Sequence, residues 1–336
     1  MKVAANRVED FCFEILTQLK TPPDESRIVA AHLVDADLRG VRSHGLIRML
    51  KYVEQIDSGY IANQATIRQE QIAPNMLRVD ADRQFGIVAF HRLLPQLISL
   101  TREFGLAGGA VVNCAHTGRM GAYSEVLARE YMWSCVFGGG GHRKLKEVAP
   151  FGGRQGVFDT NPYSISMPLD DERIATSDFA TSATAQGKLL VYRTNDRPVP
   201  PGWIIDKDGR ATSDVREFYE GGSMLPAGGV KGYGLGFMAE LFGDAVLGEP
   251  HELNWFIVAA DINRFIGASD YFSAAKVLRE KIETCPPAVG VEKVMWPGQP
   301  EIESRSRQVA EGIEYSADEL NSLSSLEARF AARLVG

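Results

Sequence analysis

The sequence predicts an α/β fold in which a β-rich middle is flanked by helices from both chain ends. Near the N-terminus, Val8, Phe11 and Ile15 recur at the spacing of one helix face. From about Asn75 to Asn263 the chain changes to short apolar runs separated by Gly, Pro, Asn and Asp, which is typical of strands with helices between them. The C-terminal segment is helical again, so we expect the two ends to form one helical region.

Length and composition restrict the class of protein. The 336 residues are 45% hydrophobic and 24% charged, which is an ordinary composition for a globular enzyme or binding protein. A net charge of −7 argues against a nucleic-acid binder or an anionic-membrane binder. The four cysteines lack paired spacing, and acidic residues occupy the place of a signal peptide's apolar run, so we expect a cytoplasmic protein. No window approaches roughly eighteen uncharged apolar residues, so we expect no membrane span.

Familiar hydrolytic sites are missing from the sequence. The six histidines include no HExxH pair, and the cysteines lack metal-ligand spacing, so we expect no metal. A GxSxG elbow is absent as well, which argues against a serine hydrolase.

The first sixty residues are predicted to form three helices. The stretch "TPPDES" (21–26) ends the first and starts the second, which Gly40 ends. Ser43 is then expected to cap a third helix over "RSHGLIRMLKYVEQI" (42–56). In that helix His44, Arg48 and Tyr52 are four residues apart and would share one face.

Acid–base chemistry is the function that this face suggests. In the first turn of a helix the macrodipole lowers the pKa of His44 unless a carboxylate offsets it, so His44 could exchange a proton near neutral pH. Arg48 offers a planar fork that suits a substrate carboxylate. The alternative is a capped helix with a solvated polar face, and the spacing alone favours that alternative.

A second candidate histidine follows a predicted strand. The stretch "VVNCAHTGRMGAYSEVLARE" (111–130) is expected to form a strand, a polar turn and a helix starting near Gly118. The turn would present Asn113 and His116 at the end of the strand, where α/β proteins often place ligand-facing groups. A turn residue satisfied by the backbone is the alternative for His116.

The glycine run after the strand "WSCVFGG" (133–139) looks like a phosphate-binding turn but fails the Rossmann fingerprint. Counted from Gly138 or from Gly139, the third glycine is replaced by Arg143 or by Lys144. The breaker "APFGG" follows in place of a helix. A dinucleotide would therefore be bound without a standard Rossmann unit. Arg143 and Lys144 could pair with a 2′-phosphate or form a solvated basic pair, so the sequence does not choose between NAD and NADP.

Two later segments combine small residues with a single charge. In "DFATSATAQGK" (178–188) Asp178 is expected to precede a small-residue helix that Gly187 ends, and the helix-cap alternative is the plainer one. The overlapping run "GKLLVYR" (187–193) is grouped with the strands. In "PAGGVKGYGLGFMAELFG" (226–243) Lys231 opens an apolar helix and suggests contact with a phosphate or carboxylate.

Packing and capping account for other residues in these segments. Close packing of helices would explain Gly234 and Gly236 without any ligand. Ser316 and Glu319 are spaced as a capping box at the start of the C-terminal helix. Uncovered apolar positions on the terminal helices, including Leu46, Met49, Leu50, Leu326, Phe330 and Leu334, are expected to face a second subunit.

Taken in order, the motifs resemble the malate/L-lactate dehydrogenase family, whose fold is unrelated to the Rossmann-type dehydrogenases. Its members include ureidoglycolate and sulfolactate dehydrogenases and piperideine-2-carboxylate reductase. The matching stretches, from about residue 37 to 301, are "DLRGVRSHGLIRMLKY", "VVNCAHTGRMGAY", "VAPFGG", "TNPYSISMP", "DFATSATAQGK", "PPGWIIDKDG", "GGVKGYGLGFMAELF" and "WPGQPE".

The resemblance implies a mixed, mostly antiparallel sheet that binds NAD or NADP without a Rossmann unit. It also implies a homodimer and hydride transfer between the nicotinamide and a small 2-oxo acid or 2-hydroxy acid. We divide the chain accordingly into a helical region of residues 1–74 packed with 275–336, and an NAD(P)-binding α/β domain of residues 75–274. The glycine run would line the nicotinamide end of the site.

By position, the resemblance makes His44 the proton donor, held by Ser43 and Asp178. It assigns Arg48, Tyr52 and Thr160 to the substrate and places His116 near the reacting carbonyl, so a swap of the acid–base role between the two histidines stays open. The implied cofactor contacts are His116, Gly140, Gly141, His142, Thr160, Asp178, Phe179, Ala180, Val230, Lys231, Gly232, Gly298 and Gln299.

Three departures from the family pattern concern the substrate and cofactor contacts. Asp159 stands where a glycine is usual, "NCAHTG" replaces "NSNHFG", and "PGQPE" replaces "PGE". Reduction of a cyclic imine carboxylate, such as piperideine-2-carboxylate, is the alternative within the family. A catalytically silent binding protein is the alternative from another class.

Overall fold

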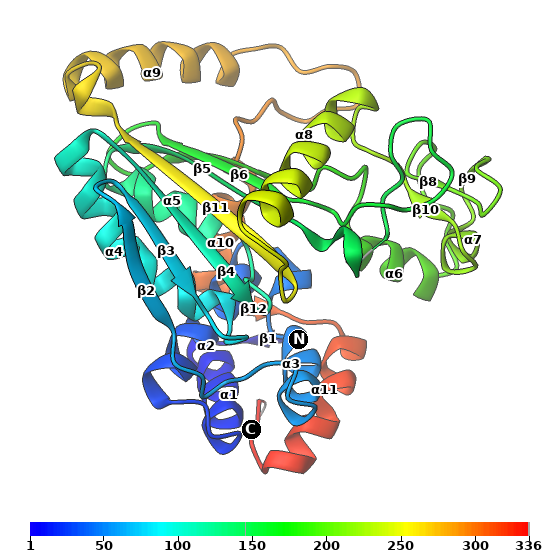
Figure 1. The fold of residues 1–336 in the computed structure, drawn as a ribbon. Coiled ribbons are helices and arrows are strands. Elements are labelled where there is room, and N and C mark those ends of the chain that lie inside the picture. The colour runs from blue at the N-terminus through cyan, green and yellow to red at the C-terminus, as the bar shows by residue number, and fades with distance from the viewer. Residues whose placement is uncertain (145, 335–336) are drawn as a thin grey trace.

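The structure, a computed structural model, describes residues 1–144 and 146–334. Within these residues seven strands form the central sheet in the order β2–β3–β4–β11–β5–β6–β7 (Figure 1). Neighbouring strands are antiparallel except β3 and β4, which the helix α4 connects as a crossover. The mixed, mostly antiparallel sheet is therefore confirmed. Its strands are β2 (Arg68–Ala73), β3 (Met76–Asp80), β4 (Leu106–Cys114), β5 (Met132–Gly139), β6 (Tyr163–Pro168), β7 (Ile174–Phe179) and β11 (Leu253–Asp261).

Helices cover both faces of this sheet. Trp255 of β11 contacts Phe90 of α4 with ring centroids 6.2 Å apart, whereas the next residue, Phe256, lies 4.9 Å from Phe242 just after α8. Successive strand residues thus face different layers, as the pleat requires. The helices are α1 (Ala5–Gln18), α2 (Pro23–Leu38), α3 (Arg48–Asp57), α4 (Gly86–Phe104), α5 (Gly121–Arg129), α6 (Gln186–Thr194), α7 (Val215–Tyr219), α8 (Val230–Leu241), α9 (Ala268–Glu283), α10 (Gln299–Glu311) and α11 (Ala317–Phe330).

The two chain ends form one helical unit beside the sheet (Figure 1). Strand β1 (Lys2–Val3) pairs with β12 (Ile313–Glu314), and α1, α2, α3 and α11 share an apolar core. Ser316 and Glu319 form the predicted capping box of α11. The expectation that this core faces a second subunit is wrong, because helices from opposite ends of the chain cover one another. The apolar residues at most 8% exposed there include Leu46, Met49, Leu326, Phe330 and Leu334.

The predicted third helix is interrupted. Arg42–His44 forms a short 3-10 turn, and α3 begins only at Arg48, with Ile47 as its N-cap. Ser43 therefore does not cap the helix. His44 also shares no continuous helix face with the residues of α3.

Asp37 of α2 accounts for this interruption. Its carboxylate accepts a hydrogen bond from the Leu46 amide at 2.8 Å. A Cβ at Gly45 would lie only 1.8 Å from the same carboxylate, so the backbone passes close against α2 at this glycine. This tertiary contact outweighs the local tendency to continue the helix.

The run at residues 187–193 is helical and belongs to α6, so its prediction as a strand is wrong. Leu189 is buried, but Leu190 and Val191 are more than half exposed, since nothing covers their side of the helix. Asp178 lies in β7, and the small-residue stretch after it forms a loop that leads into α6. A short apolar run does not by itself distinguish strand from helix.

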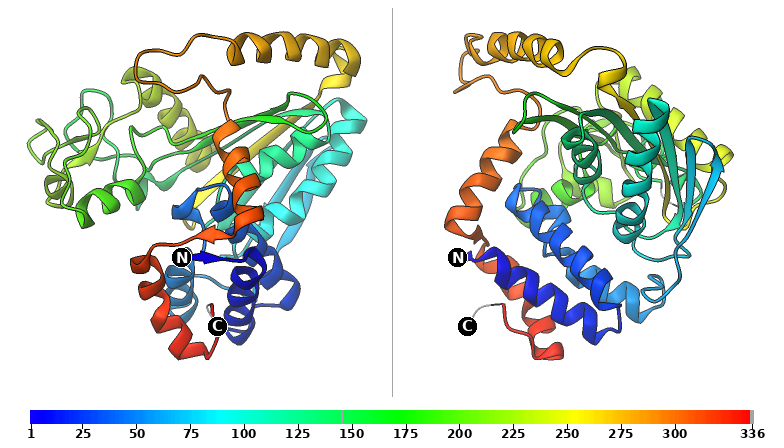
Figure 2. Two further views of the ribbon diagram at one scale, coloured as in Figure 1. Left: turned by 180° about the vertical axis from the view of Figure 1, so that it is seen from behind. Right: turned by 90° about the vertical axis from the view of Figure 1, so that its left-hand side faces the viewer.

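A small lobe and a projecting helix lie outside this core. The lobe contains α6, α7 and the short strands β8 (Ile204–Ile205), β9 (Ala211–Thr212) and β10 (Ser223–Met224) around a core of its own. Helix α9 has no buried residue and projects along the edge of the molecule (Figure 2). Among the described residues, no helix is both long enough and apolar enough to cross a membrane. The proposed division at residues 74 and 274 stays a prediction.

Candidate active site

Two histidines face each other beside α3. His44 and His116 stack with ring centroids 5.6 Å apart and planes inclined by 25°. The Nδ1 of His44 lies 2.9 Å from the Ser43 hydroxyl, and the Nδ1 of His116 lies 2.8 Å from the Tyr52 hydroxyl. The fold thus brings together residues from the turn after α2, from α3 and from the turn after β4.

The hydrogen bonds of His116 determine which ring nitrogen carries the proton. The Gly118 amide lies 3.2 Å from Nδ1 and can only donate, so Nδ1 is an acceptor. The Tyr52 hydroxyl donates to the same nitrogen. In the neutral ring the proton then sits on Nε2, and His116 can donate a hydrogen bond to a ligand oxygen from that side.

Both histidines are held in the neutral form. Desolvation and the nearby charge of Arg48 lower the pKa of His44 to about 4, and the same causes lower the pKa of His116 well below its usual value. The expectation that His44 titrates near neutral pH is wrong. It lies outside α3, and a second arginine, Arg119, also lowers its pKa.

Arg48 has a donor without an acceptor. Its Nε is buried and makes no hydrogen bond within the described part of the chain. An unsatisfied buried donor costs about 1–3 kcal/mol, more when it is charged. The guanidinium carbon lies 6.0 Å from the centroid of the Tyr52 ring, which packs against the histidine pair. This N–H can therefore donate a hydrogen bond to a ligand carboxylate next to both histidines.

Asp178 lies apart from this cluster. Its Oδ2 accepts a hydrogen bond from the Gly121 amide at 2.8 Å, and within the described residues it makes none to His44. Desolvation raises the pKa of Asp178 to about 6, against the opposing charge of Arg119. Asp178 lines a cavity of about 650 Å³ with Trp296 and Gly298. The indole Nε1 of Trp296 is buried there without a partner in the described chain.

The glycine run is occupied by the protein itself. The amides of Gly140 and His142 donate to one oxygen of Glu240, at 2.9 and 3.2 Å, and the Asp159 amide donates to the other at 3.1 Å. A Cβ at Gly139 would lie 2.1 Å from a backbone oxygen of α8. These glycines therefore allow β5 to approach α8 closely, and a carboxylate already fills the anion-binding amides.

Comparison with known proteins shows which family this chain belongs to. The family model described as malate/L-lactate dehydrogenase matches residues 3–324. The chain belongs to the malate/L-lactate dehydrogenase family. It is 31% identical over 303 residues to a malate dehydrogenase of Pyrococcus horikoshii, with 84% of this chain and 83% of the relative covered.

A second relative and a solved structure agree. The chain is 28% identical to a ureidoglycolate dehydrogenase (NAD(+)) of Escherichia coli K12, over 95% of this chain and 93% of the relative. The structure of a sulfolactate dehydrogenase from Methanocaldococcus jannaschii superposes with a TM-score of 0.88 at 26% identity, covering 99% and 98% of the two chains. The chain is therefore an oxidoreductase of this family, with the family's fold.

Other residues assigned from the family motifs gather around α8. The Thr160 carbonyl accepts a hydrogen bond from the Thr181 amide at 2.9 Å. A Cβ at Gly232 would lie 2.5 Å from the Thr181 oxygen, and one at Gly236 would lie 3.1 Å from its hydroxyl, so the start of α8 packs on this loop. Within the described part of the chain, no atom lies within 4 Å of such a Cβ at Gly234, so the packing explanation is wrong there.

The remaining assigned residues lie at the surface or beside the cavity. Val230 and Lys231 are exposed at the start of α8, and Phe179 is partly exposed beside Ala180 at the end of β7. Gly298 packs against Thr176 of the same strand, and Gln299 begins α10. Each position stays a prediction for the cofactor.

Both residues of the basic pair after the glycine run are exposed, and each has a partner within the chain. Arg143 forms an ion pair with Asp244 at 2.9 Å. The Lys144 ammonium donates to the carbonyls of Pro250 and His251 at 2.8 and 3.1 Å. Both cations thus fix the turn that leads into β11.

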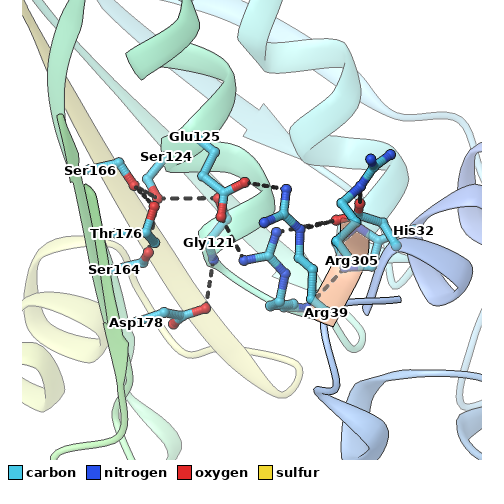
Figure 3. Close-up of polar contacts among 12 residues, drawn as sticks. His32, Arg39, Gly121, Ser124, Glu125, Ser164, Ser166, Thr176, Asp178 and Arg305 are labelled. Atoms are coloured by element: carbon cyan, nitrogen blue, oxygen red, sulfur yellow. Dashed lines mark hydrogen bonds and ion pairs between the residues drawn. The ribbon is translucent and has the colours of Figure 1, made fainter. Parts of the chain in front are cut away.

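A network of ion pairs, most of them buried, connects α2, α5 and α10 near Asp178 (Figure 3). Glu125 of α5 pairs with Arg119 at 2.9 Å and with Arg39 of α2 at 2.7 Å. Asp35 bridges the same two arginines and also pairs with Arg305 of α10. Arg119 lies between His116 and Gly121 in sequence, so the network anchors the segment that connects the histidine pair with Asp178.

Sequence reasoning missed several of these groups. One feature of the sequence could have indicated a role for Glu240, because it is a single carboxylate inside the apolar stretch "GLGFMAELF" and a buried carboxylate needs a partner. No sequence feature indicated the pairing of Glu125 with Arg39 and Arg119, since no local pattern connects these residues.

Proposed function

We propose that the enzyme transfers a hydride between NAD or NADP and a small 2-hydroxy acid, or its 2-oxo acid in reverse. The unsatisfied Nε of Arg48 beside two neutral histidines carries this proposal. An α-carboxylate at Arg48 would hold the neighbouring carbon oxygen close to the histidine pair. The named relatives act on malate and on ureidoglycolate, which are acids of this kind.

The two histidines would divide the proton chemistry. His116 donates from Nε2 to the hydroxyl or carbonyl oxygen of the substrate. When Nδ1 of His44 donates to the Ser43 hydroxyl, Nε2 of His44 is free to take the substrate's hydroxyl proton. The nicotinamide, when bound, accepts or supplies the hydride.

Substrate binding would also adjust the acidity of His44. Arg48 is one of the charges that lower the pKa of both histidines. A substrate carboxylate paired with Arg48 offsets that charge, so the pKa of His44 rises in the complex. Reduction needs a protonated His44, and the substrate's own carboxylate promotes its protonation.

The cavity beside Asp178 fits part of a nicotinamide cofactor. Its volume lies in the usual range for ligand sites, and it offers a carboxylate for ribose hydroxyls and an indole N–H without a partner. Asp178 and Gly298, which the family motifs assign to the cofactor, both line it. The exposed Lys231 would contact the diphosphate.

A reductase assay tests the proposal directly. NADH and NADPH oxidation would be followed with pyruvate, oxaloacetate and piperideine-2-carboxylate as acceptors. We expect turnover of at least one 2-oxo acid. Turnover of the cyclic imine alone would favour imine reduction, and no turnover with any acceptor would contradict the proposal.

Replacing Arg48 with lysine tests the carboxylate contact. Arg48→Lys keeps the charge but loses the planar fork, so we expect the KM for the acid to rise about 10- to 100-fold. The kcat should fall less, and the cofactor KM should stay within about twofold. The exposed arginine variant Arg68→Lys serves as the control, and an unchanged KM in Arg48→Lys would remove Arg48 from the site.

We further propose that the enzyme is a homodimer whose subunits meet at α8 and α9. The apolar side chains of Phe237, Met238 and Leu241 on α8 are 44–61% exposed, and Val277 and Leu278 on α9 are 53% and 61% exposed. Exposed apolar patches of this kind mark association sites, and a twofold dimer is the commonest closed assembly.

Light scattering during gel filtration measures the assembly. We expect a mass twice the 36.9 kDa of one chain, and a shift toward the single-chain mass in Met238→Glu. A fully active wild-type species with the mass of one chain would contradict the dimer.

A further inference from the structure

Glu252 is a carboxyl group that the chemistry described so far does not use. It lies in the turn between α8 and β11, directly before Leu253, which pairs with Cys114 of β4. Cys114 is two residues before His116, so the turn lies beside the histidine pair. The Lys144 ammonium holds the carbonyls of residues 250 and 251, and His251 donates to the Tyr60 carbonyl at 2.9 Å.

One oxygen of Glu252 lacks a partner. Its Oε2 is buried and makes no hydrogen bond within residues 1–144 and 146–334, as is true of the Nε of Arg48. The Arg48 charge lowers the pKa of Glu252, so the two groups are near each other, yet the described structure shows no ion pair between them. A ligand that accepts a hydrogen bond from Arg48 and donates one to Glu252 would satisfy both buried groups.

Asp159 is a second carboxyl group near Glu252. A Cβ at Gly141 would lie 3.2 Å from the Asp159 side chain and 2.9 Å from that of Leu253, so both pack on this glycine. Desolvation, with Asp159 nearby, raises the pKa of Glu252 to about 7.

The charges around this part of the site are unbalanced. Desolvation raises the pKa of Asp159, and the nearby charge of Glu240 raises it further. Desolvation and the charge of Asp159 also raise the pKa of Glu147, to about 7. Arg48 is a cation that lowers the pKa of Glu252, and the substrate's α-carboxylate would neutralise it, whereas the Lys144 ammonium is already bound to the carbonyls of Pro250 and His251. A second anion on the substrate would therefore meet carboxylates without a cation of its own.

We propose that Glu252 and Asp159 select substrates whose group beyond the reacting carbon is neutral and donates hydrogen bonds, and that they reject a second anion. This inference rests on the proposed function, since it assumes that Arg48 binds the α-carboxylate. An amide, ureido or hydroxyl group can donate to the unsatisfied Oε2 of Glu252. A carboxylate or sulfonate at the same place cannot.

A matched pair of substrates tests the inference. Oxaloacetate and its 4-amide, 2-oxosuccinamate, differ in one terminal group that is anionic in the first and a neutral donor in the second. The kcat/KM of both would be measured at about pH 8, above the raised pKa of Glu252, so that this carboxyl is ionised. We expect the amide to be preferred at least about tenfold by the wild-type enzyme.

Variants assign this preference to the two carboxyl groups. Glu252→Gln should lower the ratio of amide to oxaloacetate by about tenfold, and Asp159→Asn should lower it in the same direction. Glu249→Gln removes an exposed charge from the same turn and should leave the ratio as it is. Melting temperatures would show whether each variant is folded. If Glu252→Gln is not folded, the ratio measured in Asp159→Asn decides the test.

The outcomes separate this inference from the proposed function. Turnover of both substrates without a preference, or a preference that survives in the folded carboxyl variants, overturns the inference alone. Absence of turnover with both substrates while pyruvate is reduced overturns the inference alone, and absence of turnover with every acceptor and both nicotinamides overturns the inference together with the proposed function.

Discussion

Replacing His44 with alanine should lower kcat about 10²- to 10⁴-fold, the usual range for the loss of a general acid–base group. The reason is geometric. His44 has one nitrogen within 2.9 Å of the Ser43 hydroxyl and a second nitrogen free for the substrate, whereas the acceptor nitrogen of His116 is already used by Tyr52 and Gly118. Steady-state kinetics in both reaction directions would measure the loss, and cofactor affinity should change little.

A histidine outside the site provides the control. His91 is exposed on α4, and His91→Ala should keep kcat within about twofold of the wild-type value. The matched variant His116→Ala distinguishes the two roles. If His44→Ala retains turnover while His116→Ala abolishes it, the acid–base role belongs to His116.

The pH profile gives a second check on His44. Oxidation of a 2-hydroxy acid needs the neutral ring, and in the free enzyme the pKa of His44 is lowered to about 4. The kcat/KM for oxidation should therefore not fall on acidification through the ordinary histidine range near 6.5, and should fall only as the pH approaches 4. Because the pKa of Glu252 is raised to about 7, the profile would also be measured in Glu252→Gln at saturating cofactor, and a decline centred near 6.5 that remains there would contradict the assignment of His44 as a base with a lowered pKa.

Replacing Glu125 with glutamine should have the largest effect on stability. Glu125 is the carboxylate between two buried arginines, and its side chain is 5% exposed while theirs are 4% and 6% exposed. Glu125→Gln keeps the shape but removes the charge, which leaves Arg39 and Arg119 with Asp35 as the acidic residue that still forms ion pairs with both. Breaking a buried ion pair in this way costs about 3–5 kcal/mol in the free energy of unfolding. Urea unfolding at one protein concentration would measure it.

A surface pair at the end of the same helix is the matched control. Glu130 pairs with Arg102, and both side chains are well exposed, so Glu130→Gln should change the free energy of unfolding by less than about 1 kcal/mol. If the two variants unfold at the same urea concentration, the network of Glu125 contributes no more than a surface ion pair.

The sequence was sufficient where a signal is local. Helical spacing and breakers located α1 and α2, a cap pattern located the start of α11, and an apolar run located β5. The ordered series of motifs identified the family, because each motif contains its chemistry within a few residues. His44, Arg48 and His116 were found as candidates in this way before their positions in space were known.

Local patterns failed where a distant contact decides the backbone. The helix expected from Ser43 onward is interrupted because Asp37, in the preceding helix, holds the Leu46 amide and Gly45 passes close to it. The run at residues 187–193 has the composition of a strand but forms part of helix α6, which is covered on one side only. In both cases packing against another element outweighed the local preference.

By itself, the sequence determined the fold class, the family and the candidate site residues, since these depend on residue type and spacing. Only the tertiary structure decided how those residues act. It showed that the glycine run holds the Glu240 carboxylate, that burial and Arg48 lower the pKa of both histidines, and that one oxygen of Glu252 is buried without a partner in the described chain. Each of these facts is an interaction between segments far apart in the chain, and its strength depends on burial and distance, which residue spacing does not encode.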